Sequence, residues 1–159
     1  MQPIIAPIAP ELIMEELTPD KLLRPTNKGR NNIYTFSAHE APHTMREVGR
    51  LREEAFRAGG GGSGLACDID EYDLDPLGYK QLVVWNPEAQ VIVGGYRYIL
   101  GSDVVKHPKG TDILATSHMF DYSDEFVRDI LPYTIELGRS FVSPDFQSTR
   151  FHHLSIFAL

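Results

Sequence analysis

Two apolar runs separated by a short turn place the strongest constraint on the fold of this chain. Residues 79–85 read YKQLVVW, residues 91–100 read VIVGGYRYIL, and NPEAQ lies between them. Runs rich in β-branched and aromatic residues around a turn are typical of paired strands, so the pattern predicts an antiparallel hairpin. Gly94 and Gly95, inside the second run, predict a β-bulge or a close approach of another backbone.

Further segments extend this hairpin into a layered fold. Alternating residues predict strands at 32–38 and 134–142, and a serine followed by acids predicts a short helix at 123–131, with an irregular loop before it. The order of these elements predicts an α/β (α+β layered) fold, in which a mixed, largely antiparallel sheet is flanked by helices.

A longer helix is predicted at residues 42–57, where the helical period gathers apolar side chains on one side. The residues of this apolar arc are Met45, Val48, Leu51, Ala55 and Phe56. Arg52 falls within the same arc. An unpaired buried guanidinium is costly, so Arg52 must either reach water or meet an acid, and Glu136 or an acid of the 68–73 segment is the expected partner.

The chain divides into a proline-punctuated N-terminal extension, residues 1–30, and one domain over residues 31–159. Residues 21–30 form the most basic stretch, which is either a solvated face or a patch for an acidic partner or an anionic lipid surface. Five acids between residues 68 and 75 form either a solvated turn or a functional cluster.

Composition excludes several classes of protein. The net charge of −7 disfavours nonspecific binding to nucleic acid. The single cysteine, Cys67, excludes a disulfide framework and is expected to be structural, which fits a cytoplasmic location. We expect no signal peptide and no membrane span, although peripheral contact with the inner face of a membrane stays open. We also expect no metal site and no bound cofactor, because the corresponding motifs are missing.

Four motifs occur in order along the chain: LREEAF, DIDEYD, VIVGGYRYI and IELGRSFVSPDF. Together they resemble the acyl-carrier-protein-dependent N-acyltransferases of ornithine-lipid and glycine-lipid synthesis, often labelled hemolysin-like. They are distantly similar to acyl-homoserine-lactone synthases, and both groups have a GCN5-related acetyltransferase-like (GNAT) fold. The resemblance covers residues 32–150. It implies that the fold continues through further strands and helices, so the C-terminal part of the domain is expected to be missing here.

The resemblance also assigns site residues by position. It implies that the catalytic residues are Glu136, Arg52, Arg97 and Arg139. It implies that the substrate-binding residues are Phe56, Asp70, Asp73, Ser140, Phe141, Val142 and Arg150.

The residue types suit an attack by an amine on a thioester. Glu136 would take a proton from the amine, directly or through water. A strand irregularity permitted by Gly138 would expose N–H groups to the developing oxyanion, and Arg139 would pair with acids to anchor the site. In the alternative interpretation, Glu136 and Arg139 form a structural ion pair with Arg52.

The function that the resemblance implies is transfer of a long 3-hydroxyacyl chain from acyl-carrier protein to an amino acid, with glycine expected before ornithine. The donor would carry phosphopantetheine, with acyl-coenzyme A as an alternative. The acidic carrier would dock on cations at residues 21–30 or on the helix face that carries Arg46, Arg50 and Arg57. The alternatives are an acyl-homoserine-lactone synthase-like enzyme and a noncatalytic, hemolysin-like, membrane-active protein.

Overall fold

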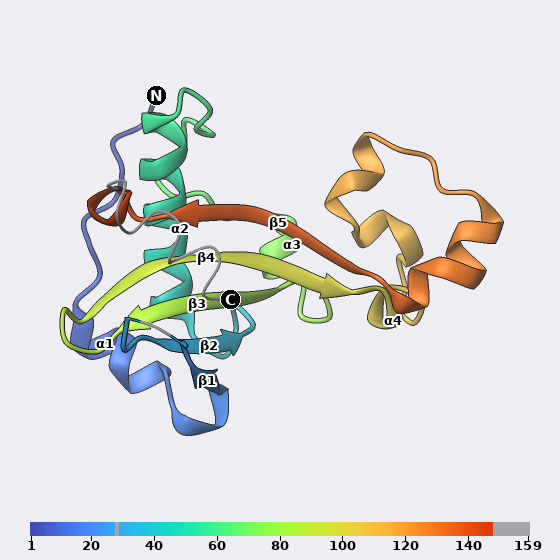
Figure 1. Ribbon diagram of the computed structural model, residues 1–159. Helices are drawn as coiled ribbons and strands as arrows, with labels where there is room; N and C mark the ends of the chain where they lie inside the picture. The colour runs from blue at the N-terminus through green and yellow to red at the C-terminus, as the bar shows by residue number, and fades with distance from the viewer. Residues whose placement is uncertain (28, 148–159) are drawn as a thin grey trace.

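The computed structural model describes residues 1–27 and 29–147, which form one sheet with helices packed against it (Figure 1). Within the described residues the sheet has five antiparallel strands in the order β1-β2-β3-β4-β5. The strands are β1 (Leu22–Pro25), β2 (Asn32–Phe36), β3 (Lys80–Asn86), β4 (Val91–Leu100) and β5 (Ile135–Val142). The predicted antiparallel sheet is therefore confirmed. The short strand β1 was not predicted, because its basic, exposed sequence has no apolar alternation.

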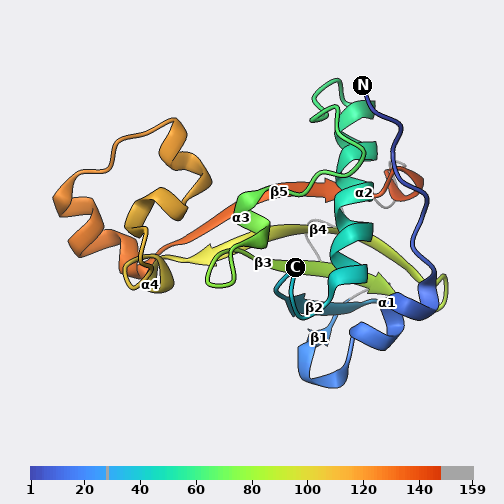
Figure 2. The same cartoon turned by 180° about the vertical axis from the view of Figure 1, so that it is seen from behind.

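Helix α2 (Pro42–Ala58) crosses one face of the sheet (Figure 2). Met45, Val48 and Leu51 pack with Val83 and Trp85 of β3 in the main hydrophobic core. The predicted apolar arc of this helix is thus the side that it buries against the sheet. Three shorter α-helices of the described residues are α1 (Pro10–Glu16), α3 (Glu71–Leu74) and α4 (Gly101–Val104).

The N-terminal segment contributes structure to the same fold. Helix α1 buries Ile13 in the main core, and β1 pairs with β2. The carboxylate of Glu16 accepts hydrogen bonds from the backbone N–H groups of His43 and Thr44, at 2.9 and 2.7 Å. Ala41, just before α2, has no side chain that could cap these donors, so α1 supplies the N-terminal cap of α2.

Gly94 and Gly95 of β4 lie beside a β-bulge and also where neighbouring backbones approach closely, and the sequence predicts one or the other of these features. Val84 pairs with Gly94 whereas Trp85 pairs with Ile92, so β4 carries one extra residue there, which is a β-bulge. A Cβ atom on Gly94 would lie 2.6 Å from the Phe141 carbonyl oxygen, and one on Gly95 would lie 2.3 Å from that of Leu82. The two neighbouring strands therefore approach too closely for any larger residue.

Strands β4 and β5 extend beyond the other strands as a two-stranded ribbon, and residues 101–134 form a lobe at its end (Figure 1). The lobe has its own small core, in which Ile113, Leu114 and Leu131 pack with Tyr79 and Ile99. Helix α4 and two 3₁₀ turns occupy the expected irregular loop. The predicted helix at 123–131 is mostly a π-helical turn, Phe126–Ile130, followed by a 3₁₀ turn that contains Pro132.

Candidate functional site

Arg52 lies inside the protein and is paired, as the sequence predicts. Its side chain is fully buried, and Nη1 lies 3.1 Å from Oδ2 of Asp73. Its Nη2 donates a 2.5 Å hydrogen bond to Oε1 of Gln81, and Gln81 in turn donates to Oδ1 of Asp73. The acid of the 68–73 segment, rather than Glu136, is therefore its partner.

Arg97 of β4 joins the same network of charges. Its Nη1 lies 2.7 Å from Oδ1 of Asp70 and 3.4 Å from Oδ2 of Asp73. Burial alone would raise the pKa of Asp70, but the hydrogen bond and the charge of Arg97 lower it overall. Asp70 and Asp73 also cap α3 reciprocally, since each side chain accepts a hydrogen bond from the backbone N–H of the other. Asp70 and Asp73 thus belong to a cluster of ion pairs and not to a solvated turn.

Arg139 reaches this cluster through a β-bulge in β5. Gly95 pairs with Phe141 whereas Arg97 pairs with Gly138, so β5 carries one extra residue between these pairs. In a regular strand, two side chains three positions apart point to opposite faces of the sheet. The extra residue of the bulge changes this alternation, so Arg139 points to the same side as Arg97. Its guanidinium lies 3.5 Å from Asp68 and 3.4 Å from Asp70.

The residue that adopts the unusual backbone conformation in this bulge is Arg139, with φ at +52°. Positive φ is uncommon for residues other than glycine. A Cβ atom on Gly138 would make only ordinary contacts, at 3.5 Å or more, with the Arg97 side chain. The prediction that Gly138 permits the irregularity was therefore wrong: the strain is located one residue later, where the ion pairs of Arg139 hold it.

Glu136 lies on the same face of the sheet but has different partners. The hydroxyl of Tyr79 donates to its Oε1, and the hydroxyl of Thr116 donates to its Oε2. Tyr79 also accepts a 2.9 Å hydrogen bond from the Ala115 N–H, which leaves its proton for Glu136. Burial, then the Glu136 hydrogen bond, raise the pKa of Tyr79, so it stays a donor. The alternative in which Glu136 forms an ion pair with Arg139 and Arg52 is not realised.

Tyr79 connects the two parts of the site. The guanidinium carbon of Arg97 lies 4.7 Å from the centroid of the Tyr79 ring and 5.4 Å from that of Tyr72. A cation over an aromatic face is attracted by the ring quadrupole. One tyrosine therefore contacts the arginine cluster with its ring and the Glu136 carboxylate with its hydroxyl.

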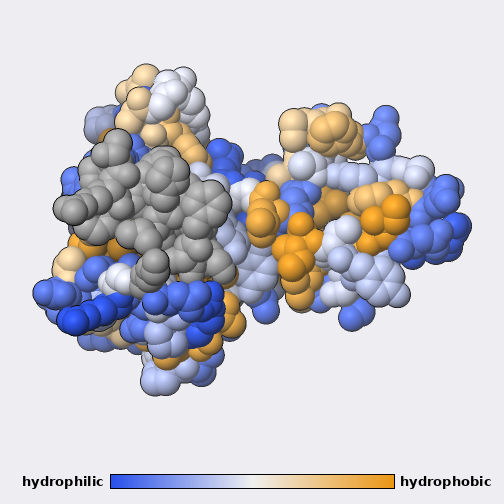
Figure 3. Space-filling model, viewed as in Figure 1, coloured by the Kyte–Doolittle hydropathy of each residue, from blue (hydrophilic) through white to orange (hydrophobic). Residues whose placement is uncertain are grey.

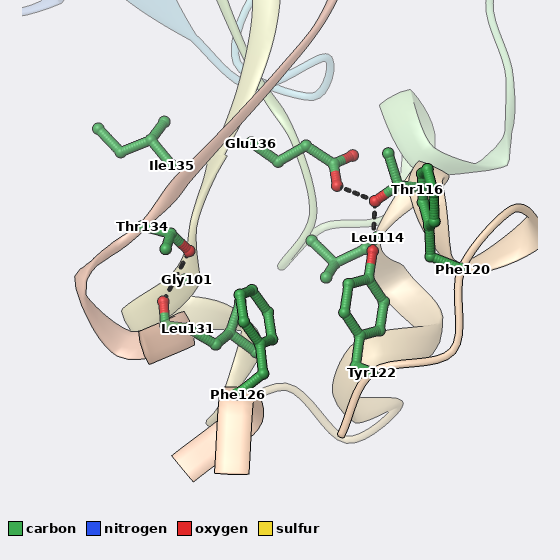
Figure 4. Close-up of a pocket in the computed structure, with 10 residues that line it drawn as sticks. All are labelled: Gly101, Leu114, Thr116, Phe120, Tyr122, Phe126, Leu131, Thr134, Ile135 and Glu136. Atoms are coloured by element: carbon green, nitrogen blue, oxygen red, sulfur yellow. Dashed lines mark hydrogen bonds between the residues drawn. The ribbon is translucent and has the colours of Figure 1, made fainter. Parts of the chain in front are cut away.

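A cavity of about 300 Å³ opens beside Glu136, between the start of β5 and the lobe (Figure 4). Its apolar and aromatic walls are Leu114, Phe120, Phe126, Leu131 and Ile135. Its polar groups are Glu136, Thr116, Tyr122 and Thr134, together with the backbone of Gly101. The carboxylate is thus next to a space large enough for part of a small ligand.

The remaining predicted site residues take structural positions or lie elsewhere. Phe56 packs against the main core, Phe141 and Val142 are buried, and Ser140 is exposed. Arg150 lies outside the described residues. The roles assigned to these residues stay predictions, although the first three are already engaged in packing.

Burial raises the pKa of the Cys67 thiol to about 11, so it stays protonated, as a structural cysteine does. Within residues 1–27 and 29–147, no three His, Cys, Asp or Glu side chains are grouped so as to hold a metal ion. No helix in that same part of the chain has the length and apolar character needed to cross a membrane.

Sequence reasoning missed Tyr79, Gln81 and Thr116. A signal for Gln81 was present, because strand alternation places it on the same face as Val83 and Trp85, where a polar residue requires a buried partner. Thr116 comes from a loop more than thirty residues away from Tyr79 in the sequence, and no local pattern marks either hydroxyl.

Similar sequences place the chain in a known family. A protein-family profile described as "Acetyltransferase (GNAT) domain" matches residues 51–156. The chain is 58% identical over all of its 159 residues to "Glycine N(alpha)-acyltransferase" of Bacteroides thetaiotaomicron, and covers 47% of that protein. It is 56% identical to the protein of the same name from Phocaeicola vulgatus, of which it covers 49%. The chain therefore spans about half the length of these curated relatives. No solved structure matches it.

Proposed function

Because the chain belongs to the GNAT acetyltransferase-domain family, we propose that it carries the catalytic carboxylate of an N-acyltransferase that acylates glycine. The single observation that carries the proposal is the position of Glu136. Its carboxylate is oriented by two neutral hydroxyls and faces a cavity, with no arginine or lysine among its partners. A carboxylate that is not neutralised by a cation keeps its capacity to accept a proton.

In the proposed reaction, the glycine amine loses its proton to Glu136, directly or through one water molecule. The neutral amine attacks the carbonyl carbon of an acyl thioester, and a tetrahedral oxyanion forms. The nitrogen then loses its second proton, the oxyanion collapses, and the carbon–sulfur bond breaks. The departing sulfur takes up the proton that the nitrogen has lost, and Glu136 returns its own proton to water. The products are an N-acylglycine and a free thiol.

The β5 bulge supports a role in stabilising the oxyanion. A bulge leaves the backbone groups of its extra residue outside the ladder of hydrogen bonds. The bulge begins three residues after Glu136, at Arg139, and the ion pairs with Asp68 and Asp70 hold it in place. Fixed N–H groups near the carboxylate are the kind of donor that this chemistry uses.

We propose further that the donor is a long 3-hydroxyacyl chain on acyl-carrier protein, which would make the product an aminolipid precursor. This extension rests on the family resemblance of the sequence motifs. The expected docking face on α2 is weaker than its sequence suggests: Glu47 and Glu54 hold Arg50, Glu53 holds Arg57, and Arg46 alone is exposed. Residues 21–30 are therefore the better candidate for contact with an acidic carrier.

The test replaces Glu136 with glutamine in the complete natural protein. Glu136→Gln keeps the shape and one acceptor oxygen but cannot take the amine proton, so transfer should fall by roughly 10²–10⁴-fold while the fold is retained. The assay measures N-acylglycine by mass spectrometry at saturating acyl-carrier thioester, so that a binding defect is not mistaken for a chemical one.

The same assay distinguishes the other candidates. Ornithine acylation in place of glycine acylation would change the acceptor, and lactone formed from S-adenosylmethionine would indicate the acyl-homoserine-lactone alternative. Membrane lysis that survives Glu136→Gln would favour the hemolysin-like alternative. Near-wild-type transfer by Glu136→Gln would leave this carboxylate a structural role.

A further inference from the structure

The cavity beside Glu136 offers no partner to the carboxylate of glycine. Among the described residues that line it, none is lysine or arginine, and its single charge is the Glu136 carboxylate itself. A second carboxylate placed there would be repelled and would lack a cation to pair with. The carboxylate end of the acceptor amino acid is therefore a poor occupant of this space.

The polar groups of the cavity are also already engaged. The Thr116 hydroxyl donates to Glu136 and lies within hydrogen-bonding distance of the Tyr122 hydroxyl. The Thr134 hydroxyl donates a 2.8 Å hydrogen bond to the Leu131 carbonyl oxygen. What the walls offer a ligand is mainly apolar and aromatic surface, including the rings of Phe126 and Tyr122 that border the open space in Figure 4.

The size of the cavity narrows the class of ligand further. A volume of about 300 Å³ is at the lower end of the range for ligand sites. One water molecule takes about 30 Å³ in the liquid, and a methylene group is of similar size, so the space accommodates on the order of ten methylene groups. The surface near the cavity is apolar as well: Met119 and Phe120 are more than half exposed, and Figure 3 shows hydrophobic residues gathered on the lobe.

We propose that this cavity binds the alkyl chain of the acyl donor, with the thioester end of the chain at Glu136. The inference rests on the proposed acyl transfer and adds to it a location for the chain. The carboxylate at one end of the cavity would then face the reacting carbonyl group. The depth of the apolar cavity would limit the length of the alkyl chain that fits. Phe126 and Leu114 are, in this arrangement, the residues that set chain-length preference.

The first experiment measures binding of straight-chain alcohols, from hexanol to dodecanol, to the 159-residue chain by calorimetry. Each added methylene group should raise the affinity roughly fourfold until the cavity is full. Phe126→Trp reduces the space and should lower decanol affinity by about tenfold, whereas Phe126→Ala should move the limit to a longer alcohol. Leu114→Phe narrows the same space and is the second variant if Phe126→Trp fails to fold.

The matched control is Leu77→Trp, which adds the same indole ring at an exposed residue in a different cavity of about 350 Å³. It should leave alcohol affinity unchanged. Affinity that does not depend on chain length, or an equal loss in Leu77→Trp and Phe126→Trp, would overturn the proposal.

A second experiment separates this inference from the proposed function. In the complete natural protein, the acyl chain-length profile of glycine acylation should shift to shorter chains in Phe126→Trp. Glycine acylation with an unchanged profile would overturn the cavity assignment alone, as would a raised KM for glycine with no change of profile. Alcohol binding that follows the expected pattern, in a protein that does not acylate glycine, would uphold the cavity and refute the proposed acceptor.

Discussion

The carboxylates near the two ends of the β4–β5 pair have different kinds of partners. Next to α2, Asp70 and Asp73 are surrounded by Arg52, Arg97 and Arg139, and the network is largely buried. Next to the lobe, Glu136 is held by two neutral hydroxyls and faces a cavity. The first arrangement neutralises its acids, whereas the second orients an acid and leaves its charge uncompensated by a cation.

A structural role and the proposed chemical role are therefore carried by different residues of the same strand, β5. Glu136 and Arg139 are only three residues apart, yet the bulge gives each a separate environment. Buried ion pairs with several partners resist rearrangement, because any displaced charge would be left unpaired. The arginine cluster is therefore the fixed support, and the carboxylate beside the cavity is the group to which we assign proton transfer in the proposed reaction.

The largest effect on stability is expected from removing the central arginine of the cluster. Arg52→Ala leaves Asp73 and Gln81 buried without their main partner, which should lower the free energy of unfolding by about 3–5 kcal/mol. Urea denaturation measures the loss. The control is Arg128→Ala, whose exposed ion pair with Asp129 should change stability by less than about 0.5 kcal/mol. Equal effects of the two substitutions would mean that the cluster is not a structural support.

Low pH should lower the free energy of unfolding, because another buried carboxylate is held by hydrogen bonds to its charged form. Glu53 is fully buried; burial alone would raise its pKa, but hydrogen bonds from Ser63, Arg57 and Gly64 lower it from 4.5 to about 2. A lowered folded-state pKa gives stability that is present above the unfolded value. That stability, at most about 3 kcal/mol, should be lost as the pH falls from about 4.5 towards 2.

Urea midpoints measured across this pH range test the expectation, with Glu53→Gln as the comparison. The substituted protein is less stable at pH 7 but lacks this carboxyl group, so its stability should fall less on acidification. Asp68 contributes with the opposite sign, because burial raises its pKa, and it is common to both proteins. Parallel losses in the two proteins would contradict the assignment to Glu53.

Local patterns predicted the main elements of the fold. Helix 42–57 and strands 79–85, 91–100 and 134–142 agree with the structure to within about two residues, because their periodicity reflects one buried face. The inward position of Arg52 followed from the same helical period. Strand β1 was missed because its pairing with β2 depends on tertiary contacts and not on its own composition.

The sequence predicted site residues mainly where a charged residue interrupts an otherwise apolar helix or strand, or falls in the acidic segment. Arg52, Arg97 and the acids of the 68–73 segment were identified and do lie together. The hydroxyls of Tyr79 and Thr116 were not identified, since a threonine in an irregular lobe has no pattern that links it to a glutamate on a strand. The left-handed conformation of Arg139 was also unpredictable, because its ion pairs hold it there and its sequence does not.

The smallest effect, and the sharpest test of the comparison, is expected from removing one hydroxyl beside Glu136. Tyr79→Phe keeps the buried ring over Arg97 but removes the donor to Oε1 and the acceptor of the Ala115 N–H. Loss of one hydrogen bond to a carboxylate should lower kcat for acyl transfer roughly tenfold with little change in KM. The matched control is Tyr72→Phe, because the Tyr72 ring also lies beside Arg97 but its hydroxyl contacts His118. If Tyr72→Phe lowered kcat as far as Tyr79→Phe, the effect would come from the arginine cluster, and the distinction between a fixed support and a reactive carboxylate would fail.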